Sequence, residues 1–220
     1  NLTPEQIAEC VVSIGDGFLF APAQHSAMKH AIGPRRELAM RTLFNVLGPL
    51  TNPAFVQRQV LGVYDAALCE PLANALRELG SIHALVLHSE DGLDEISIAA
   101  PTRGFELHHG AINPIEIVPE MYGHAHDSLE GLQVATALES ATLIRAVLAG
   151  EPGSALRKAR SIITLNAGAG IYVSGKVPTL TEGVVAAEVA ITSGAAIEKL
   201  EAFAALTQEL ARASEEVSDR

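Results

Sequence analysis

Short apolar runs and stretches with helical spacing alternate in the middle of the chain. Residues 59–64 and 82–87 are near-continuous apolar runs of strand length, whereas residues 72–79 have apolar positions at helical spacing and are followed by Gly80. A strand, a helix and a second strand in this order form a βαβ unit, whose strands are parallel. Strands that are apolar on both faces are typical of a sheet covered on both sides. We therefore predict an α/β fold with a mostly parallel central sheet covered by helices.

The first quarter of the chain predicts two helices with a strand-like segment between them. Thr3 and Gln6 have the spacing of a capping box, so we expect a helix that continues to Ile14 and ends at the following glycine. Residues 18–20 are a short apolar run of strand type. A second helix is expected over residues 34–47, where a Gly-Pro pair ends it.

The last third of the chain is rich in alanine and has a helical period. Before it, residues 97–118 have a more broken pattern, with a strand-like piece at 115–118. The small residues at 166–170 lie within a helical pattern, so we expect them to allow close helix packing rather than to bind a dinucleotide. Helices are predicted near 138–149, 154–173, 180–193 and 195–213.

Composition and charge narrow the class of protein. Hydrophobic residues make up 48% and charged residues 19% of the 220 positions, which is typical of a globular protein. The net charge is −11, which opposes binding to nucleic acid because that affinity comes from Lys and Arg. No apolar run is long enough for a membrane span, and the polar start does not resemble a secretory leader. Cys10 and Cys69 are expected to be thiols in a reducing cytoplasm.

The loop after the second predicted strand contains four acids. Glu90 and Asp91 come first, and Asp94 and Glu95 follow as an adjacent pair. Ligands of parallel α/β sheets bind beyond the carboxyl ends of the strands, where this loop lies. Adjacent carboxylates suit Mg²⁺, a hard cation that prefers oxygen ligands and can screen a phosphorylated substrate. The alternative is an acidic loop that is simply solvated.

Two arginines open the second predicted helix. The helix dipole disfavours cations in the first turn by about 0.3–1 kcal/mol, so Arg35 and Arg36 are unusual there. A guanidinium can bind a carboxylate through two hydrogen bonds, which points to an anionic ligand. The alternative is that Arg36 pairs with Glu37 at the surface and Arg35 is exposed. The residues alone leave both interpretations open.

Eight histidines raise the question of a zinc site. The pairs His108-His109 and His124-x-His126 lack both the four-residue helical spacing and the cysteine partners of zinc motifs. We expect these side chains to be solvated loop histidines.

Several motifs of the chain match those of one enzyme family. They are Phe18-Leu19-Phe20-Ala21-Pro22, His25, Met28-Lys29, Arg35-Arg36-Glu37-Leu38, Arg41-Thr42, Phe44-Asn45-Val46-Leu47-Gly48-Pro49-Leu50-Thr51-Asn52-Pro53, Gly92-Leu93-Asp94-Glu95-Ile96-Ser97, Leu165-Asn166-Ala167, Glu182-Gly183 and Ser193-Gly194. Together they closely resemble anthranilate phosphoribosyltransferases, over nearly the whole chain.

The resemblance implies a reaction and a fold. The reaction is transfer of the phosphoribosyl group of 5-phosphoribosyl-1-pyrophosphate to anthranilate, with Mg²⁺, in tryptophan biosynthesis. The fold is the C-terminal domain shared by nucleoside phosphorylases and phosphoribosyltransferases, and a homodimer is implied for the intact protein. We expect no covalent nucleophile and assign no general base, because the chemistry needs a neutralised leaving group and a well-placed amine.

The resemblance also implies site residues. Arg35 matches the arginine that contacts the anthranilate carboxylate, and His25 and Gly48-Pro49 match positions that line the anthranilate path or pocket. Asp94 and Glu95 match the acids that hold Mg²⁺ on the pyrophosphate.

The family's glycine-rich phosphoribosyl-binding loop and N-terminal helical domain are not among these residues. We therefore expect residues 1–220 to be a single α/β domain, incomplete at its N-terminal side, which shows no transfer alone. Residues 129–132 and 139–141 also depart from the family pattern.

Two alternatives belong to other classes. A pyrimidine nucleoside phosphorylase would not be expected to show the motif of residues 47–53, and a nucleic-acid-binding relative would need a basic surface.

Overall fold

The structure, a computed structural model, describes residues 2–19, 48 and 50–218. Within this last range, only the backbone of residues 214–218 is described. The chain divides into two compact units, Asn1–Gly48 with Ala195–Arg220, and Pro49–Gly194. The prediction of a single α/β domain over residues 1–220 stays a prediction.

The first unit contains the helices α1 (Pro4–Ile14) and α9 (Ala195–Ser218). The predicted capping box is confirmed: Gln6 N donates to Thr3 Oγ1 over 3.3 Å, and Thr3 N donates to Gln6 Oε1 over 2.9 Å. Gly15 ends α1 in the left-handed conformation, at φ 83°. The two helices contact each other through a hydrogen bond in which Gln6 Nε2 donates to the carbonyl of Leu210 over 2.8 Å. Phe18 and Leu19 lie in no strand, and the helix predicted over 34–47 lies outside the described residues.

The second unit is built on a four-stranded sheet in the order β1-β2-β3-β4. β1 pairs parallel to β2, and the helix between them confirms the predicted βαβ unit. The pairs β2–β3 and β3–β4 are antiparallel. The strands and the crossover helix are β1 (Arg58–Gly62), α5 (Cys69–Glu78), β2 (His83–Ser89), β3 (Thr102–His108) and β4 (Ala111–Ile117).

The α/β class is confirmed, but the sheet of the described residues is mixed rather than mostly parallel. Two antiparallel pairs make the difference: β3 runs antiparallel to β2, and a two-residue hairpin turn then pairs β4 with β3. In this turn His109 and Gly110 both have positive φ, at 48° and 85°. Such turns match the twist of antiparallel strands. The broken pattern of residues 97–118 concealed β3, since half-exposed strands lack a continuous apolar run.

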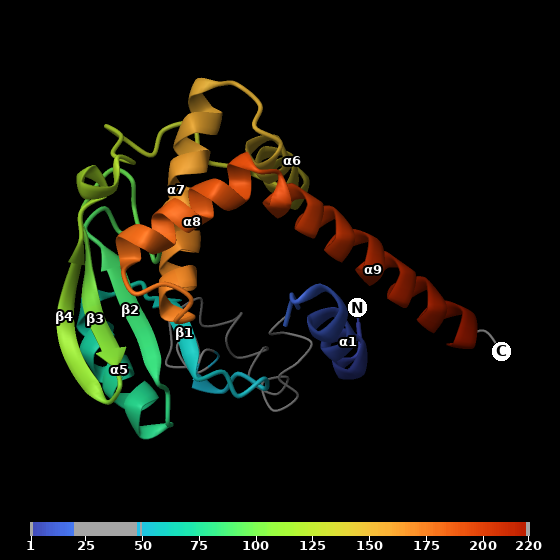
Figure 1. The fold of residues 1–220 in the computed structure, drawn as a ribbon, viewed down its shortest axis with the longest axis horizontal. Helices are drawn as coiled ribbons and strands as arrows, with labels where there is room; N and C mark the ends of the chain where they lie inside the picture. Colours follow the sequence, from blue (N-terminus) through green and yellow to red (C-terminus); the bar gives the residue numbers. More distant parts are fainter. Residues whose placement is uncertain (1, 20–47, 49, 219–220) are drawn as a thin grey trace, which may run out of the picture. The chain divides into compact units, whose positions relative to one another are not determined.

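Helices cover both faces of this sheet. α5 lies on one side of the strands and α7 (Ser154–Val173) on the other, as Figure 1 shows. α8 (Leu180–Thr192) packs on α7, where a Cβ at Gly183 would lie 2.3 Å from the carbonyl oxygen of Gly168. Close packing through the small residues of 166–170 is therefore confirmed. The other elements of this unit are η2 (Ala66–Leu68), η3 (Pro119–Tyr122) and α6 (Ala137–Leu148).

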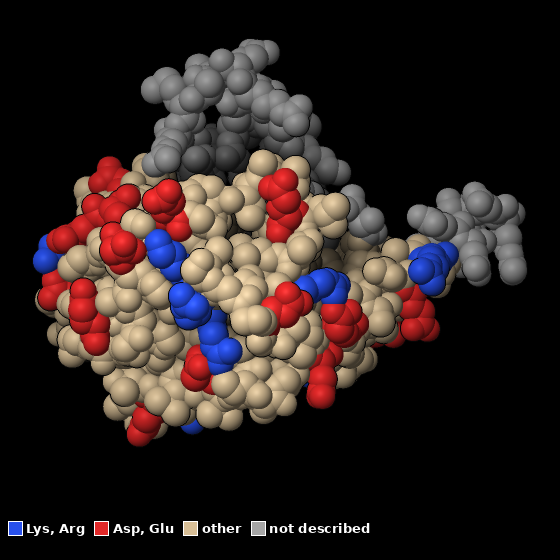
Figure 2. Space-filling model, turned by 90° about the horizontal axis from the view of Figure 1, so that it is seen from above, with Lys and Arg blue, Asp and Glu red and all other residues tan. Residues whose placement is uncertain are grey.

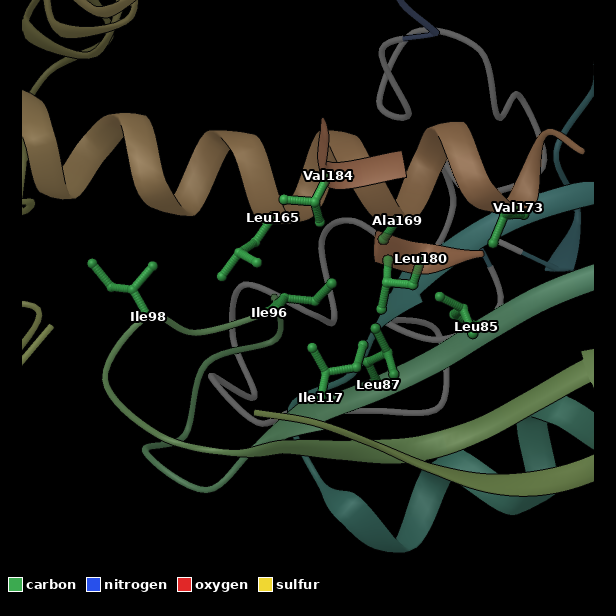
Figure 3. Packing of buried hydrophobic residues seen from close by; sticks show 10 residues of the cluster. All are labelled: Leu85, Leu87, Ile96, Ile98, Ile117, Leu165, Ala169, Val173, Leu180 and Val184. Atoms are coloured by element: carbon green, nitrogen blue, oxygen red, sulfur yellow. The ribbon is translucent and has the colours of Figure 1, made fainter. Parts of the chain in front are cut away.

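The main core lies between α7, α8 and the sheet. Its buried members come from both helices, from β2 and β4, and from the loop after β2 (Figure 3): Leu85, Leu87, Ile96, Ile98, Ile117, Leu165, Ala169, Val173, Leu180 and Val184. Because Ile96 and Ile98 are 0% exposed, the loop that carries the acidic residues is anchored in the core. The fold thus holds this loop in a defined position beside the sheet.

The helices of the described part of the chain differ in length and hydropathy, the two properties that decide whether a helix can span a membrane. No single helix there is both long and apolar enough to cross a membrane, and only α8 and residues 195–213 of α9, taken together as a bent pair, meet the length and composition criteria.

Candidate functional site

The predicted acidic loop connects β2 to β3, at the carboxyl ends of β1 and β2. Its backbone passes directly over Gly62, the last residue of β1. A Cβ on Gly62 would lie 1.5 Å from the carbonyl oxygen of Asp94, so any side chain there would displace the loop. Gly62 therefore sets the distance between the end of β1 and Asp94.

Asn166 of α7 holds the same loop from the other side. Its Oδ1 accepts a hydrogen bond from Ile96 N over 3.0 Å, and its Nδ2 donates to the carbonyl of Ile96 over 2.9 Å. The Nδ2 also donates to the carbonyl of Ile162, one turn earlier in α7. One side chain thus pairs both backbone groups of a buried residue next to Glu95. In the sequence Asn166 stands out only as part of a family motif, and this contact supplies a physical reason for it.

Two of the four acids have partners inside the loop region. Asp91 accepts from Ser97 Oγ over 2.5 Å and from Leu93 N over 3.3 Å, which closes the turn. Glu90 forms an ion pair with Arg103 of β3. These two side chains therefore stabilise the loop.

The other two acids lack such partners within the described part of the chain. Asp94 and Glu95 are exposed, and their side chains make no hydrogen bond or ion pair with any residue that the structure describes. Partial burial raises the pKa of Glu95, and the neighbouring charge of Asp94 raises it further. A divalent cation would offset both effects by neutralising the pair. Adjacent, unengaged carboxylates on an anchored loop are the oxygen donors that Mg²⁺ prefers.

A hollow opens beside this pair. Its volume is about 410 Å³, and Leu93 and Glu95 form part of its wall. The rest of the wall comes from the segment before α6 and from α6 and α7, with mostly aliphatic side chains that include Leu132, Leu143 and Ile162. Glu95 thus lies between solvent and an apolar hollow, which agrees with the raised pKa of its carboxyl group.

Most of the remaining predicted site residues are not among the residues that the structure describes. His25, Arg35 and Pro49 lie outside the described residues. Gly48 has helical backbone and is partly buried, and it belongs to the first unit, whereas Asp94 and Glu95 belong to the second. Their assignment to a common site stays a prediction.

The motif after Gly48 has a local structural role. Asn52 Oδ1 accepts from Ala54 N over 2.9 Å, and Phe55 N donates to the carbonyl of Asn52 over 3.0 Å. Asparagine favours such turns because its side chain can bond the backbone two residues on. This part of the motif therefore forms the turn that leads into β1.

The histidines near residue 125 are not simply solvated. His126 Nε2 lies 3.0 Å from Ser161 Oγ, and His126 N donates to the carbonyl of Ile98 over 2.7 Å. Burial lowers the pKa of the neighbouring His124. The prediction of solvated loop histidines is wrong for this pair, because the segment packs on α7 and on the loop after β2.

Acidic side chains dominate one edge of the face drawn in Figure 2, with a row of basic side chains beside them. Several basic groups of α7 are already paired: Arg160 binds Glu188 over 2.5 Å, and Lys158 lies 3.4 Å from Asp127.

The fold is that of an α/β transferase domain. The chain belongs to the glycosyl transferase family, whose α/β-domain model matches residues 1–197. Among the curated relatives, the anthranilate phosphoribosyltransferase of Azotobacter vinelandii is 53% identical over 207 residues, which cover 94% of this chain and 60% of the relative. The chain thus spans about three fifths of the length of the curated relatives it matches.

Solved structures give the same answer. The anthranilate phosphoribosyltransferase of Thermus thermophilus matches 94% of this chain and 60% of its own, with a TM-score of 0.85 and 39% identity. The Saccharomyces cerevisiae enzyme matches at 27% identity with 4-fluoroanthranilate bound, and at 28% with PRPP and Mg bound. Their TM-scores are 0.79 and 0.78. Each match spans 92% of this chain, and it spans 59% of the first structure's chain and 58% of the second's. The resemblance predicted from the sequence is confirmed.

Proposed function

We propose that this chain serves the transfer of the phosphoribosyl group from 5-phosphoribosyl-1-pyrophosphate to the amine of anthranilate. The products are N-(5-phosphoribosyl)anthranilate and pyrophosphate, in a step of tryptophan biosynthesis. The chain supplies the acceptor-binding residues and a metal-binding pair. The proposal is supported by the family match and by relatives whose solved structures hold 4-fluoroanthranilate, PRPP and Mg.

The observation that carries the proposal is the division of the four loop acids. Glu90 and Asp91 are used to hold the loop, whereas Asp94 and Glu95 are presented without partners among the described residues. A loop that only needed to be soluble would not require Gly62 below it and Asn166 clamping its backbone. This arrangement supports a ligand function for the pair.

In this proposal Asp94 and Glu95 would hold Mg²⁺, which neutralises charge on the pyrophosphate leaving group when bound. Arg35 binds the anthranilate carboxylate through charged hydrogen bonds, which orients the amine. His25, Gly48 and Pro49 line the acceptor pocket. The chain's contribution is placement and charge, with no covalent intermediate on a side chain.

The test is an assay on the protein as expressed from its own gene, with anthranilate, 5-phosphoribosyl-1-pyrophosphate and Mg²⁺. The expected result is consumption of anthranilate with an equal amount of pyrophosphate released. Phosphate-dependent cleavage of a pyrimidine nucleoside without anthranilate transfer would instead identify a nucleoside phosphorylase. Binding of nucleic acid with neither reaction would identify a non-catalytic relative.

Further features belong to the same proposal. A homodimer and a cytoplasmic location are expected, the latter supported by the free, buried thiols of Cys10 and Cys69. The 220-residue chain alone is expected to give no product above a buffer control, since it spans about three fifths of its relatives.

A further inference from the structure

Three potential metal ligands lie on one face of the sheet, at the opposite end of β2 from the acidic loop. His83 opens β2 and is directly opposite His108, the last residue of β3. Glu106 comes two residues before His108, so both side chains point to the same face of the strand. The register of two strands thus brings one buried histidine, one carboxylate and one exposed histidine together.

The contacts within this cluster are short. His83 Nε2 lies 2.8 Å from Glu106 Oε1, and the rings of His83 and His108 stack with their centroids 4.3 Å apart. The hydroxyl of Tyr172, from α7, donates to the same Glu106 oxygen over 2.6 Å. One potential ligand atom from each of His83, Glu106 and His108 lies within 4.8 Å of the others.

We propose that His83, Glu106 and His108 bind a divalent transition-metal ion of the zinc type. Two imidazoles and one carboxylate form a ligand set found in zinc proteins, with the fourth position left for water. Two ligands at positions i and i+2 of one strand and a third directly across on its neighbour converge on one point above the sheet.

The existing geometry is close to what coordination requires. Donor atoms on a tetrahedral zinc ion with bonds of about 2.0–2.1 Å lie roughly 3.3 Å apart. The three ligand atoms already lie within 4.8 Å of one another, and binding requires the exposed His108 ring to rotate out of its stack on His83. The ion takes the place of the hydrogen between His83 Nε2 and Glu106, so the His83 ring binds with its proton on Nδ1.

The surroundings keep the ligands ready. His83 is buried and its Nε2 faces Glu106 Oε1, so the packing of the sheet holds this nitrogen in place. The Tyr172 hydroxyl donates to Glu106 Oε1 over 2.6 Å and thereby orients the carboxylate. Outer partners of this kind are typical of metal sites. His108 is exposed and gives the ion a path from solvent.

This site is separate from the proposed Mg²⁺ pair in position and in chemistry. β2 has seven residues, so its two ends are about 20 Å apart at roughly 3.3 Å per residue. Imidazole ligands favour zinc, whereas the acids of the loop favour Mg²⁺. The two ions can therefore be distinguished in one sample.

The test is calorimetric titration of the purified protein, expressed from its own gene, with Zn²⁺, in excess Mg²⁺ so that oxygen-only sites are already filled. The variants are His108→Ala and Glu106→Gln, and the matched control is His109→Ala, the neighbouring exposed histidine. His83 is left intact because it is buried in the sheet. Co²⁺ absorption provides a second measurement, which reports tetrahedral coordination directly.

We expect one Zn²⁺ to bind per chain. The His108→Ala and Glu106→Gln variants should bind it at least about tenfold more weakly than the wild type, since even the loss of an outer-shell partner lowers metal affinity roughly 10–100-fold. His109→Ala should bind as the wild type does. Equal Zn²⁺ affinity of the wild type and His108→Ala would overturn the proposal. An equally large loss in His109→Ala would also overturn it, because binding would then belong to the hairpin surface. The Co²⁺ spectrum should show the tetrahedral band in the wild type and lose it in His108→Ala; a wild-type spectrum without that band would contradict the site.

Discussion

Asp94 and Glu95 differ from the two acids before them by their surroundings rather than by residue type. From the sequence, the family motif singles out Asp94 and Glu95, whereas residue type alone does not separate them from Glu90 and Asp91. The pairing of Asp91 with Ser97 and of Glu90 with Arg103 separates them. Those partners are six and thirteen residues away, so only the folded chain defines which acids remain available.

Arg35 is the residue that distinguishes an anthranilate enzyme from a general phosphoribosyl enzyme. Arg35→Ala should raise the KM for anthranilate roughly ten- to a hundredfold, because a charged hydrogen bond contributes about 1.5–3 kcal/mol. The KM for 5-phosphoribosyl-1-pyrophosphate should change far less. Steady-state kinetics with each substrate varied in turn measures both values.

Arg36→Ala is the matched control for this variant, and its kinetics should resemble those of the wild type. Equal effects of Arg35→Ala on both substrates would point to a shared phosphate contact. An Arg35→Ala enzyme with unchanged kinetics would remove the support for the acceptor assignment.

Asn166 should matter for stability through the loop that it clamps. Asn166→Ala leaves the N–H and the carbonyl of Ile96, a residue that is 0% exposed, without their partner. One unpaired buried polar group costs about 1–3 kcal/mol. Because the variant leaves two such groups, the free energy of unfolding should fall by at least about 1–3 kcal/mol. Denaturant unfolding measures the change.

Asn113→Ala, at an exposed position of β4, is the control and should lie within about 0.5 kcal/mol of the wild type. If Asn166→Ala and Asn113→Ala unfold at the same denaturant concentration, the clamp does not hold the loop.

At the level of elements, two glycines of α7 should respond to the same substitution with opposite signs. A Cβ on Gly168 would lie 2.7 Å from the Cα and N of Val184, so Gly168→Ala forces α7 and α8 apart. Overpacking of this kind costs about 1–3 kcal/mol. Gly170 is exposed, and a Cβ added there would meet no described atom within 4 Å beyond the helix's own backbone. Gly170→Ala should therefore stabilise the helix by about 0.5–1 kcal/mol.

Thermal or denaturant midpoints of the two variants test this pair, since each serves as the control for the other. Two midpoints shifted in the same direction would contradict the packing of α7 on α8.

The helices were predictable from the sequence because their ends carry local signals. Thr3, Thr136 and Thr179 cap α1, α6 and α8 with their side chains, and each lies within a few residues of the amides that it binds. β3 and β4 were not predictable as a hairpin, because their pairing depends on a turn at His109 with positive φ. Non-glycine residues are uncommon in that conformation, and a His-Gly pair is a weaker hairpin signal than Asn-Gly or Asp-Gly.

At the scale of the whole molecule, the sequence predicted the α/β class and the βαβ unit but not the mixed sheet. The cluster of His83, Glu106 and His108 escaped sequence analysis for the same reason. His83 and His108 are far apart along the chain, and only the antiparallel register of β2 and β3 places them opposite each other. Motifs with fixed short spacing are visible in a sequence, whereas cross-strand sites require the register.

We propose that the anchored loop after β2 presents Asp94 and Glu95 as the Mg²⁺ ligands of a phosphoribosyl transfer. The most direct test is a Mg²⁺ titration of transfer activity in the protein expressed from its own gene, for the wild type and for Asp94→Asn combined with Glu95→Gln. Glu151→Gln, an exposed acid before α7, is the control. Unfolding midpoints should agree among all three proteins, because exposed acids contribute little to stability.

The double variant should turn over more slowly and need at least about tenfold more Mg²⁺ for half of its maximal rate, by analogy with losses at other metal sites. The Glu151→Gln protein should follow the wild-type curve. A double variant that keeps wild-type turnover across the whole titration would contradict the assignment of Asp94 and Glu95.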